Sequence, residues 1–286
     1  MKIKSGTAAD STSSPQGARD PCLPAPNNPA HKRSGIVVDW MSHIRMRHSL
    51  SVSTMNTHSV SMNNLSLFAV LREAVRGKAI SRTMTNLFWL GMEPITGNLL
   101  DIGGGGGYAS HYRFIPIAKE TKIQTVDVVP RPNTDFVLDI TKEKVPLPDA
   151  SEDAVFLFNI LEHLNAHDAA LAEVRRLLKE GGKLYGTIPF LVNVHPDPHD
   201  YVRFTDEALR ELFTRNGFTV VAIEPIGRGP FLAAYEQLDS LIPSFCHALF
   251  LPLVWLADAI VQHLRPKRDF PAVFPLAYNF VVQKNV

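Results

Sequence analysis

The sequence predicts an α/β fold in which helices cover both faces of a doubly wound, parallel sheet. Short apolar segments alternate with amphipathic stretches from residue 98 to about residue 225, and five consecutive glycines follow the first apolar segment. Alternating strands and helices with short connections imply a parallel sheet, because parallel strands need crossovers and these are right-handed. Ligands of such sheets bind at the carboxyl ends of the strands.

Composition limits the classes of protein to consider. The 286 residues, 45% of them hydrophobic, are enough for one full core. A formal net charge of +1 gives no global basic field, so we expect no nucleic-acid partner. The two cysteines, Cys22 and Cys246, exclude a disulfide framework and a cysteine-rich zinc site. No apolar segment follows Lys2 and Lys4, so we expect no secretory signal and a cytoplasmic protein.

The chain divides into three parts by composition. Residues 1–60 carry few large apolar side chains, which predicts a disordered N-terminal extension. Apolar residues at helical spacing on both sides of Gly77 predict two helices within 61–95, a helical lead-in that covers the ligand cleft. The remaining residues, 96–286, form one domain.

The first strand and its turn are the stretch 98–107. In a Rossmann-like unit, glycines allow a tight turn, close approach of backbone to a ligand, and packing of the next helix on the strand. Gly103, Gly105 and Gly107 have G-x-G-x-G spacing, which differs from the G-x-G-x-x-G of dinucleotide enzymes and disfavours a nicotinamide-dependent oxidoreductase. The segment from Asp101 to Gly107 resembles motif I of class I methyltransferases that use S-adenosylmethionine, which implies that Asp101 and the three glycines bind this cofactor.

Polar side chains also end the next strands. Asp127 ends the second strand, where a carboxylate can accept hydrogen bonds from a ribose diol, and it matches motif II of the methyltransferases. The resemblance implies that Asp139 and the backbone of Ile140, at the end of the third strand, contact adenine. Asn159 ends the fourth strand. With Asp101, these side chains predict one cofactor crevice at the carboxyl edge of the sheet.

The remaining elements continue the α/β pattern. A crossover helix is expected over 108–119, short or broken because of Pro116. The segment Leu161-Glu162-His163-Leu164 resembles the signature that follows the fourth strand in methyltransferases of small molecules and lipids; we interpret His163 as a structural residue. A helix from Asp168 is expected to stop at Gly181-Gly182, before a fifth strand over 183–189. Further strands are predicted at 218–224 and 277–283, and the resemblance implies a seven-stranded, mostly parallel sheet whose last strand is antiparallel.

The loop after the fifth strand is the predicted acceptor site. Its segment Pro-His-Asp-Tyr-Val-Arg-Phe-Thr resembles the H-D-Y-x-R-F-T segment of bacterial methyltransferases found with glycan or polyketide modification systems. Methyl transfer to a hydroxyl needs alignment and removal of a proton. At neutral pH a histidine can take that proton, so His199 or His195 is the predicted base, with Asp200 orienting the ring. Tyr201 and Arg203 are then expected to contact the acceptor.

Two other interpretations of this loop stay open. The residues His195, Asp197, His199 and Asp200 carry metal-compatible atoms. We nevertheless expect no metal, because a metal site also needs ligands from elsewhere and an organised second shell. In the structural alternative, Asp200 pairs with Arg203, and the loop only caps a helix over 206–216.

The motifs together predict transfer of a methyl group from S-adenosylmethionine to an oxygen of a small-molecule, sugar or lipid-linked acceptor. The alternative is a regulatory or scaffolding protein that binds S-adenosylmethionine without catalysis. The oligomeric state is left open.

An apolar helical insertion is predicted over 231–272. Its core, 241–264, is long enough to span a bilayer, but two prolines, a histidine and an aspartate make an uninterrupted lipid-facing helix costly. Arg265, Lys267 and Arg268 follow directly, as basic residues do beside anionic headgroups. We hypothesise peripheral contact with the inner face of a membrane; a buried helical pair acting as a lid or a dimer surface is the alternative.

Overall fold

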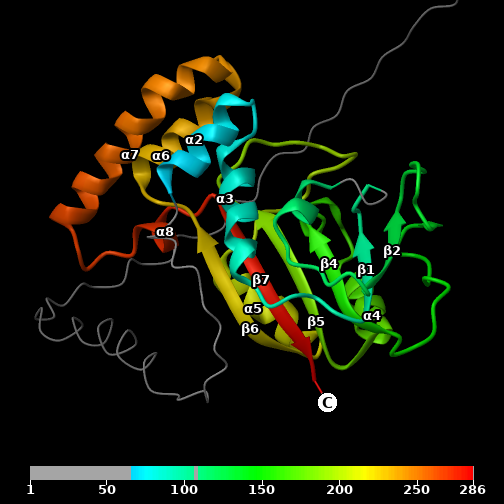
Figure 1. Cartoon of the computed structure of the whole chain (residues 1–286). Helices are drawn as coiled ribbons and strands as arrows, with labels where there is room; N and C mark the ends of the chain where they lie inside the picture. Colours follow the sequence, from blue (N-terminus) through cyan, green and yellow to red (C-terminus); the bar gives the residue numbers. More distant parts are fainter. Residues whose placement is uncertain (1–65, 106–108, 286) are drawn as a thin grey trace, which may run out of the picture. The chain divides into compact units, whose positions relative to one another are not determined.

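A computed structural model of the chain describes residues 66–105 and 109–285 (Figure 1). All of these described residues belong to one compact unit, Asn56–Val286. The extension predicted over 1–60 and the predicted cofactor residue Gly107 lie outside the described residues.

The centre of the described unit is a seven-stranded sheet with the strand order β3-β2-β1-β4-β5-β7-β6. The strands are β1 (Asn98–Ile102), β2 (Lys122–Asp127), β3 (Phe136–Val137), β4 (Glu152–Phe158), β5 (Leu178–Pro189), β6 (Phe218–Ile226) and β7 (Ala277–Lys284). Neighbours from β3 to β5 pair in parallel, whereas β7 is antiparallel to both β5 and β6. The predicted Rossmann-like sheet with an antiparallel last strand is therefore confirmed.

The central strands are apolar on both faces because both faces are covered. On β1, Leu100 and Ile102 join a core with helices α4 (His167–Leu177) and α5 (Asp206–Arg215). Leu99 points to the opposite face and packs in a second core with Trp89. This alternation explains why the sheet is doubly wound, and the predicted helix over 206–216 is confirmed as α5.

A helical cap lies at one end of the sheet (Figure 1). It contains α2 (Leu67–Val75), α3 (Ile80–Phe88), α6 (Pro230–Leu238), α7 (His247–Leu264) and α8 (Phe270–Val273). Helix α7 packs against α6 and α2, and α3 packs against β6 and β7. The cap therefore joins the segment before the sheet to the insertion between β6 and β7.

Two expected helix boundaries are wrong. The crossover helix expected over 108–119 is, in its described part, only a 3-10 turn, η4 (Ser110–Arg113), after which Ile95 and Ile117 form a parallel bridge. Pro116 lacks an N–H and disfavours helical backbone at the preceding residue, which accounts for the extended path. Helix α4 ends at Leu177, before Gly181-Gly182, because the fully buried Leu178 already adopts extended backbone and pairs with β4.

Candidate functional site

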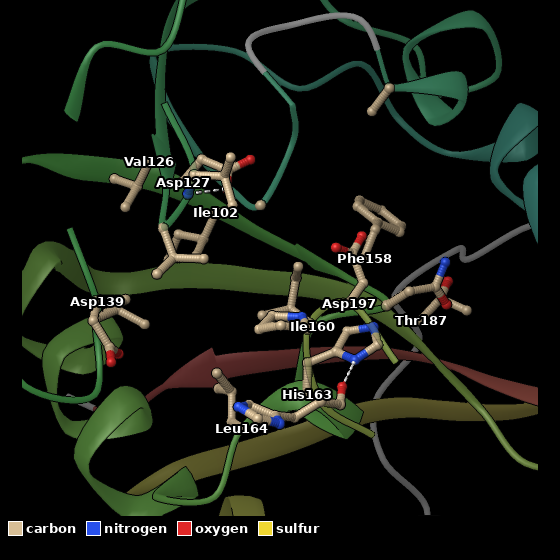
Figure 2. Close-up of a pocket in the computed structure, with 18 of the residues that line it drawn as sticks. Ile102, Val126, Asp127, Asp139, Phe158, Ile160, His163, Leu164, Thr187 and Asp197 are labelled. Carbon is tan, nitrogen blue, oxygen red and sulfur yellow. Dashed lines mark hydrogen bonds between the residues drawn. The ribbon is translucent and has the colours of Figure 1, made fainter. Parts of the chain in front are cut away.

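A cavity of about 440 Å³ opens at the carboxyl ends of the parallel strands (Figure 2). It lies where the strand order reverses between β1 and β4, the position at which sheets of this kind bind ligands. The predicted site residues that line it are Gly103, Asp127, Asp139, Ile140, Asn159, His195, His199 and Tyr201. Further lining residues come from α3 (Arg82, Thr85, Asn86) and from the segment after β4 (Ile160, His163, Leu164). Residues predicted from separate stretches of sequence therefore surround one cavity.

The glycine turn favours glycine at two positions through its left-handed backbone, and at one of them also through lack of space. Gly103 has a φ of +77°, and a Cβ there would lie 2.0 Å from the Cδ1 atom of Ile160. Gly105 has a φ of +63°, but a Cβ there would meet only the Cδ atom of Arg131, at 3.9 Å. Left-handed backbone disfavours side chains at both positions, and only Gly103 is also enclosed by its neighbours.

Asp101 lies beneath this turn, and it is not among the described residues that line the cavity. It is fully buried and accepts a hydrogen bond from the Tyr112 hydroxyl at 2.5 Å, with the Nε2 atom of His111 at 3.3 Å. Burial and the carboxylate charge raise the pKa of Tyr112 far above its ordinary value. A Cβ at Gly104 would lie 1.8 Å from the Asp101 carboxylate. Asp101 thus supports the turn rather than facing the cavity.

The acids at the ends of β2 and β3 are held by their own turns. Asp127 accepts a hydrogen bond from the Val129 backbone N–H at 2.9 Å, and its other carboxylate oxygen is 3.4 Å from Arg131 Nε. Asp139 accepts hydrogen bonds from both the backbone and the hydroxyl of Thr141, at 2.9 and 2.6 Å. Although burial opposes it, Lys142 and Thr141 hold the pKa of Asp139 below its ordinary value. Both side chains are therefore fixed at the cavity by contacts within their own turns.

Asn159 follows β4 with a φ of +54°, and its backbone N–H donates to the Thr187 carbonyl at 2.8 Å. This unusual backbone turns the chain away from the sheet and over the cavity. The 3-10 turn η5 (Leu161–His163) comes directly after it.

In the acceptor loop, Asp200 faces Arg203 rather than His199. The two guanidinium NH groups of Arg203 donate to the carboxylate, one of them at 2.7 Å, and hold the pKa of Asp200 far below its ordinary value. Asp200 also accepts a hydrogen bond from the His195 backbone N–H at 2.9 Å. Neither Asp200 nor Arg203 is among the described lining residues. The pair predicted as the structural alternative is present, and it orders the loop that carries His195 and His199.

Two residues of the site were missed as functional residues. The Oε1 atom of the fully buried Glu162 lies 3.7 Å from the Nε2 atoms of both His163 and His195. His163, interpreted from sequence as structural, lines the cavity. Glu162 and the Asn193 carbonyl raise the pKa of His195 above its ordinary value. The position of the Leu-Glu-His-Leu segment directly after a central strand was the available signal for both residues.

Comparison with known proteins shows what part of the chain is similar to. Residues 100–186 match the family model described as a methyltransferase domain. A search of curated proteins found no match. Solved structures similar to the chain include the [4+2]-cyclase SpnF, at 19% identity and a TM-score of 0.45, covering 77% of this chain and 93% of that chain.

Two further similar structures are methyltransferases. The Burkholderia thailandensis 1,6-didemethyltoxoflavin-N1-methyltransferase has 17% identity and a TM-score of 0.41, covering 76% of this chain and 79% of that chain. The Haemonchus contortus phosphoethanolamine N-methyltransferase 2 has 19% identity and a TM-score of 0.43, covering 77% and 57%. Similarity at this level says nothing of a shared acceptor. The family match, by contrast, covers the glycine turn and the ends of β1 to β4 that surround the cavity, so this part of the chain is similar to a methyltransferase domain.

Proposed function

We propose that the protein transfers a methyl group from S-adenosylmethionine to a hydroxyl oxygen of a small molecule, a sugar or a lipid-linked compound. The observation that carries this proposal is one cavity with two chemically different ends. Two aspartates and the glycine turn lie at or just after the ends of β1 to β3, and a histidine-bearing loop lies beyond β5.

The first end suits the donor. Asp127 offers a buried carboxylate for the ribose hydroxyls, and Asp139 with the backbone of Ile140 suits the adenine. The left-handed turn at Gly103 lets backbone approach the ligand closely. This end alone also fits the alternative of a binding protein without catalysis.

The second end suits the chemistry. The carbon–sulfur bond of the sulfonium breaks as an oxygen–carbon bond forms, and the hydroxyl proton passes to a base, leaving S-adenosylhomocysteine and a methyl ether. His199 lines the cavity from an exposed loop, and we assign it as that base, with His195 as the alternative. Asp200 positions the loop through Arg203 and the His195 backbone. Tyr201 lines the acceptor end.

Two measurements test the proposal. Release of S-adenosylhomocysteine in the presence of hydroxyl-bearing sugars, small phenols and lipid-linked sugars is expected for at least one class. Binding of S-adenosylmethionine without release in any of them favours the regulatory or scaffolding alternative. Methylation found on nitrogen in the product contradicts the assignment to oxygen.

We also propose that the exposed face of α7 holds the enzyme against an anionic membrane surface. Five aliphatic residues, each more than half exposed, follow one another at spacings of three and four along this helix: Leu249, Leu253, Leu256, Ile260 and Leu264. By length and composition Ser244–Leu264 is apolar enough to cross a membrane, and only 22% of it is buried. Leu251, Trp255 and Asp258 face inward, and Asp258 accepts hydrogen bonds from the first turn of α6 at 3.0 Å.

The charges beside this face support a lipid surface as its partner. Arg265, Lys267 and Arg268 follow the helix directly and are all exposed, and basic residues at such a position interact favourably with anionic headgroups. An apolar stripe flanked by basic residues is typical of segments that lie in the membrane interface. Such contact brings the cavity close to lipid-linked acceptors.

Co-sedimentation with anionic vesicles at moderate salt tests this contact. The parent protein is expected in the pellet, and a Leu253→Glu/Leu256→Glu double variant in the supernatant. Val137→Glu, at an exposed position on the edge strand β3, is the matched control and is expected to sediment like the parent. Parent protein that stays wholly in the supernatant contradicts the proposal and leaves the face as a lid or dimer surface.

A further inference from the structure

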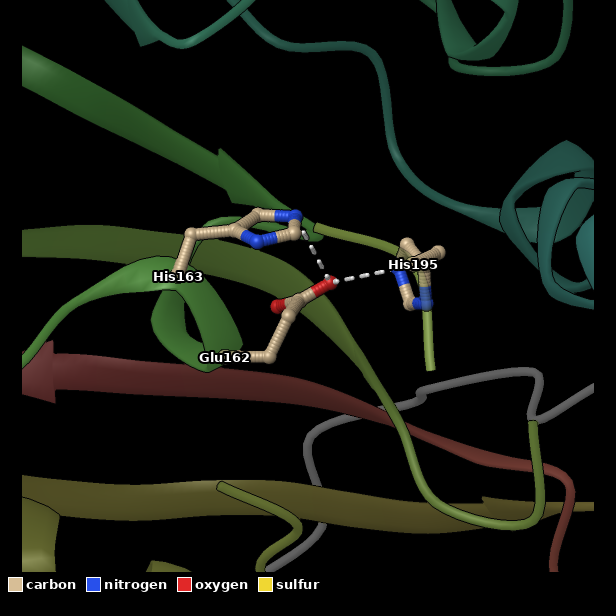
Figure 3. A group of neighbouring side chains, drawn as sticks. All are labelled: Glu162, His163 and His195. Atoms are coloured by element: carbon tan, nitrogen blue, oxygen red, sulfur yellow. Dashed lines mark ion pairs between the residues drawn. The ribbon is translucent and has the colours of Figure 1, made fainter. Parts of the chain in front are cut away.

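Glu162, His163 and His195, here called the Glu162 cluster, bring three acceptor atoms together beside the cavity (Figure 3). Glu162 and His163 belong to η5, and His195 belongs to the loop after β5. One carboxylate oxygen lies 3.7 Å from the Nε2 atom of each ring, and the three atoms lie within 4.8 Å of one another. Both rings line the cavity.

Hydrogen bonds to backbone carbonyls fix the tautomer of both rings. The Nδ1 atom of His163 bonds the His199 carbonyl, and the Nδ1 atom of His195 bonds the Asn193 carbonyl at 2.9 Å. A carbonyl oxygen only accepts, so each Nδ1 carries the hydrogen, and in a neutral ring each Nε2 presents a lone pair. Three atoms with lone pairs, which accept hydrogen bonds or bind a cation, therefore point toward one another.

The burial of Glu162 calls for a positive charge close to its carboxylate, where the structure places the two imidazole rings and no lysine or arginine within ion-pair distance among the described residues. Its side chain is fully buried, and neither carboxylate oxygen has a hydrogen-bond partner in the described part of the chain. Arg203 interacts with Glu162 electrostatically, but it directs its hydrogen bonds to Asp200 and to the Val202 carbonyl. A buried carboxylate without a partner is strongly unfavourable, so the cluster needs a cation at its centre.

We propose that the Glu162 cluster binds one divalent transition-metal ion of the zinc type. Two imidazole nitrogens and one carboxylate oxygen form a ligand set of catalytic zinc sites, which keep a further position open. Zinc bonds of about 2.0–2.1 Å place tetrahedral ligand atoms about 3.3–3.4 Å apart, so each observed carboxylate–nitrogen distance of 3.7 Å requires closure by only a few tenths of an ångström, and the ligand atoms already lie within 4.8 Å of one another. Nδ1–H groups bonded to carbonyls are the usual outer shell of metal-binding histidines.

This site differs from the one considered in the sequence. Of His195, Asp197, His199 and Asp200, only His195 belongs to the cluster. The missing ligands come from η5, a distant segment, and the outer shell comes from the carbonyls of Asn193 and His199. Both objections to a metal in this loop are thereby met, and the expectation of no metal is revised.

The role of the ion rests on the proposed methyl transfer, whereas its binding does not. Because His163 and His195 line the cavity, the open position of the ion faces the acceptor end. A divalent ion there lowers the pKa of a coordinated hydroxyl. His199, whose carbonyl holds the His163 ring, is placed to receive the proton that leaves.

Metal titration of the full-length, untagged protein tests the proposal. After treatment with a chelator, the parent is titrated with Co²⁺ by visible absorption and with Zn²⁺ by calorimetry, and one ion per chain is expected. Glu162→Gln and His195→Ala are each expected to weaken binding at least tenfold, since even outer-shell changes cost about 10–100-fold. His263→Ala, on the exposed end of α7, is the matched control and is expected to bind like the parent.

Binding of S-adenosylmethionine is measured on every variant, together with thermal unfolding. The His195 side chain is 41% exposed, so His195→Ala is expected to fold. The test therefore stays decisive even if Glu162→Gln does not fold. A parent that binds no ion, or binds it no better than His195→Ala, overturns the metal site. If such a parent still binds S-adenosylmethionine, the proposed function stands without the metal. Failure to bind S-adenosylmethionine contradicts the proposed function, whatever the metal result.

Discussion

The two ends of the cavity are built differently. At the cofactor end, Asp127 and Asp139 each accept a hydrogen bond from the backbone two residues further on. At the acceptor end, the His163 ring bonds a carbonyl 36 residues away, and Glu162 meets a ring on the same distant loop. Local turns therefore define the first end, whereas tertiary contacts define the second. We expect the cofactor end to tolerate changes in the loop after β5. The acceptor end is expected to depend on the position of that whole loop.

The largest expected effect is on the cofactor end of the cavity. Gly103→Val is predicted to abolish measurable binding of S-adenosylmethionine, because the new side chain would overlap Ile160 and strain left-handed backbone. Calorimetry measures the binding. Gly181→Val imposes similar backbone strain, at a φ of +73°, inside β5 where its pairing with β4 shifts register, and should bind normally if folded. Normal binding by the Gly103 variant would remove the turn from the cofactor site.

The next effect concerns the acceptor end. His199→Ala is predicted to slow methyl transfer by about 10²–10⁴-fold, the usual cost of losing a general base, with binding of S-adenosylmethionine unchanged. Single-turnover release of S-adenosylhomocysteine measures it, with His263→Ala as the control. If the variant is as fast as the parent, His199 only orders the loop, and the assignment of the base passes to His195.

A moderate effect is expected at the cofactor end. Asp127→Ala removes a charged acceptor worth about 1.5–3 kcal/mol, which weakens S-adenosylmethionine about 10–150-fold. Displacement of bound S-adenosylhomocysteine gives the affinity. Asp149→Ala removes an exposed carboxylate on the loop before β4 and should leave the affinity unchanged. Equal affinity in both variants would take Asp127 out of the site.

The smallest effect on the cavity itself is expected from a change in the helical cap that supports both ends, where the change acts on the stability of the fold. Glu236 on α6 accepts a hydrogen bond from the Ser81 backbone N–H of α3, which lines the cavity, and burial raises the pKa of Glu236 to about 7. A raised folded-state pKa stabilises the fold below pH 4.5, and this contribution is lost as pH rises through 7.

Glu236→Gln is therefore predicted to be more stable than the parent by about 3 kcal/mol at pH 8, with little difference at pH 4.5. Urea unfolding at both pH values measures it. If the variant and the parent are equally stable at both pH values, the raised pKa of Glu236 is contradicted.

The cofactor end could be predicted from the sequence better than the acceptor end. Apolar alternation predicted the sheet, and Asp127 and Asp139 were recognisable because Asp127 ends β2 and Asp139 follows β3 by two residues. Glu162 and His163 were not recognised, since their partner lies on a distant loop that only the fold brings near. The path after the glycines was mispredicted because Pro116 replaces a helix with an extended segment. Sequence therefore predicts contacts within a turn better than contacts across the cavity.

Calorimetric titration of the full-length protein with S-adenosylmethionine, alongside NAD⁺ as the rival ligand, tests the central claim most directly. Saturable binding of one S-adenosylmethionine per chain and no binding of NAD⁺ are expected, because the G-x-G-x-G spacing and the match to a methyltransferase domain favour the first ligand. Binding of NAD⁺ in preference, or binding of neither ligand, would contradict the assignment of this cavity.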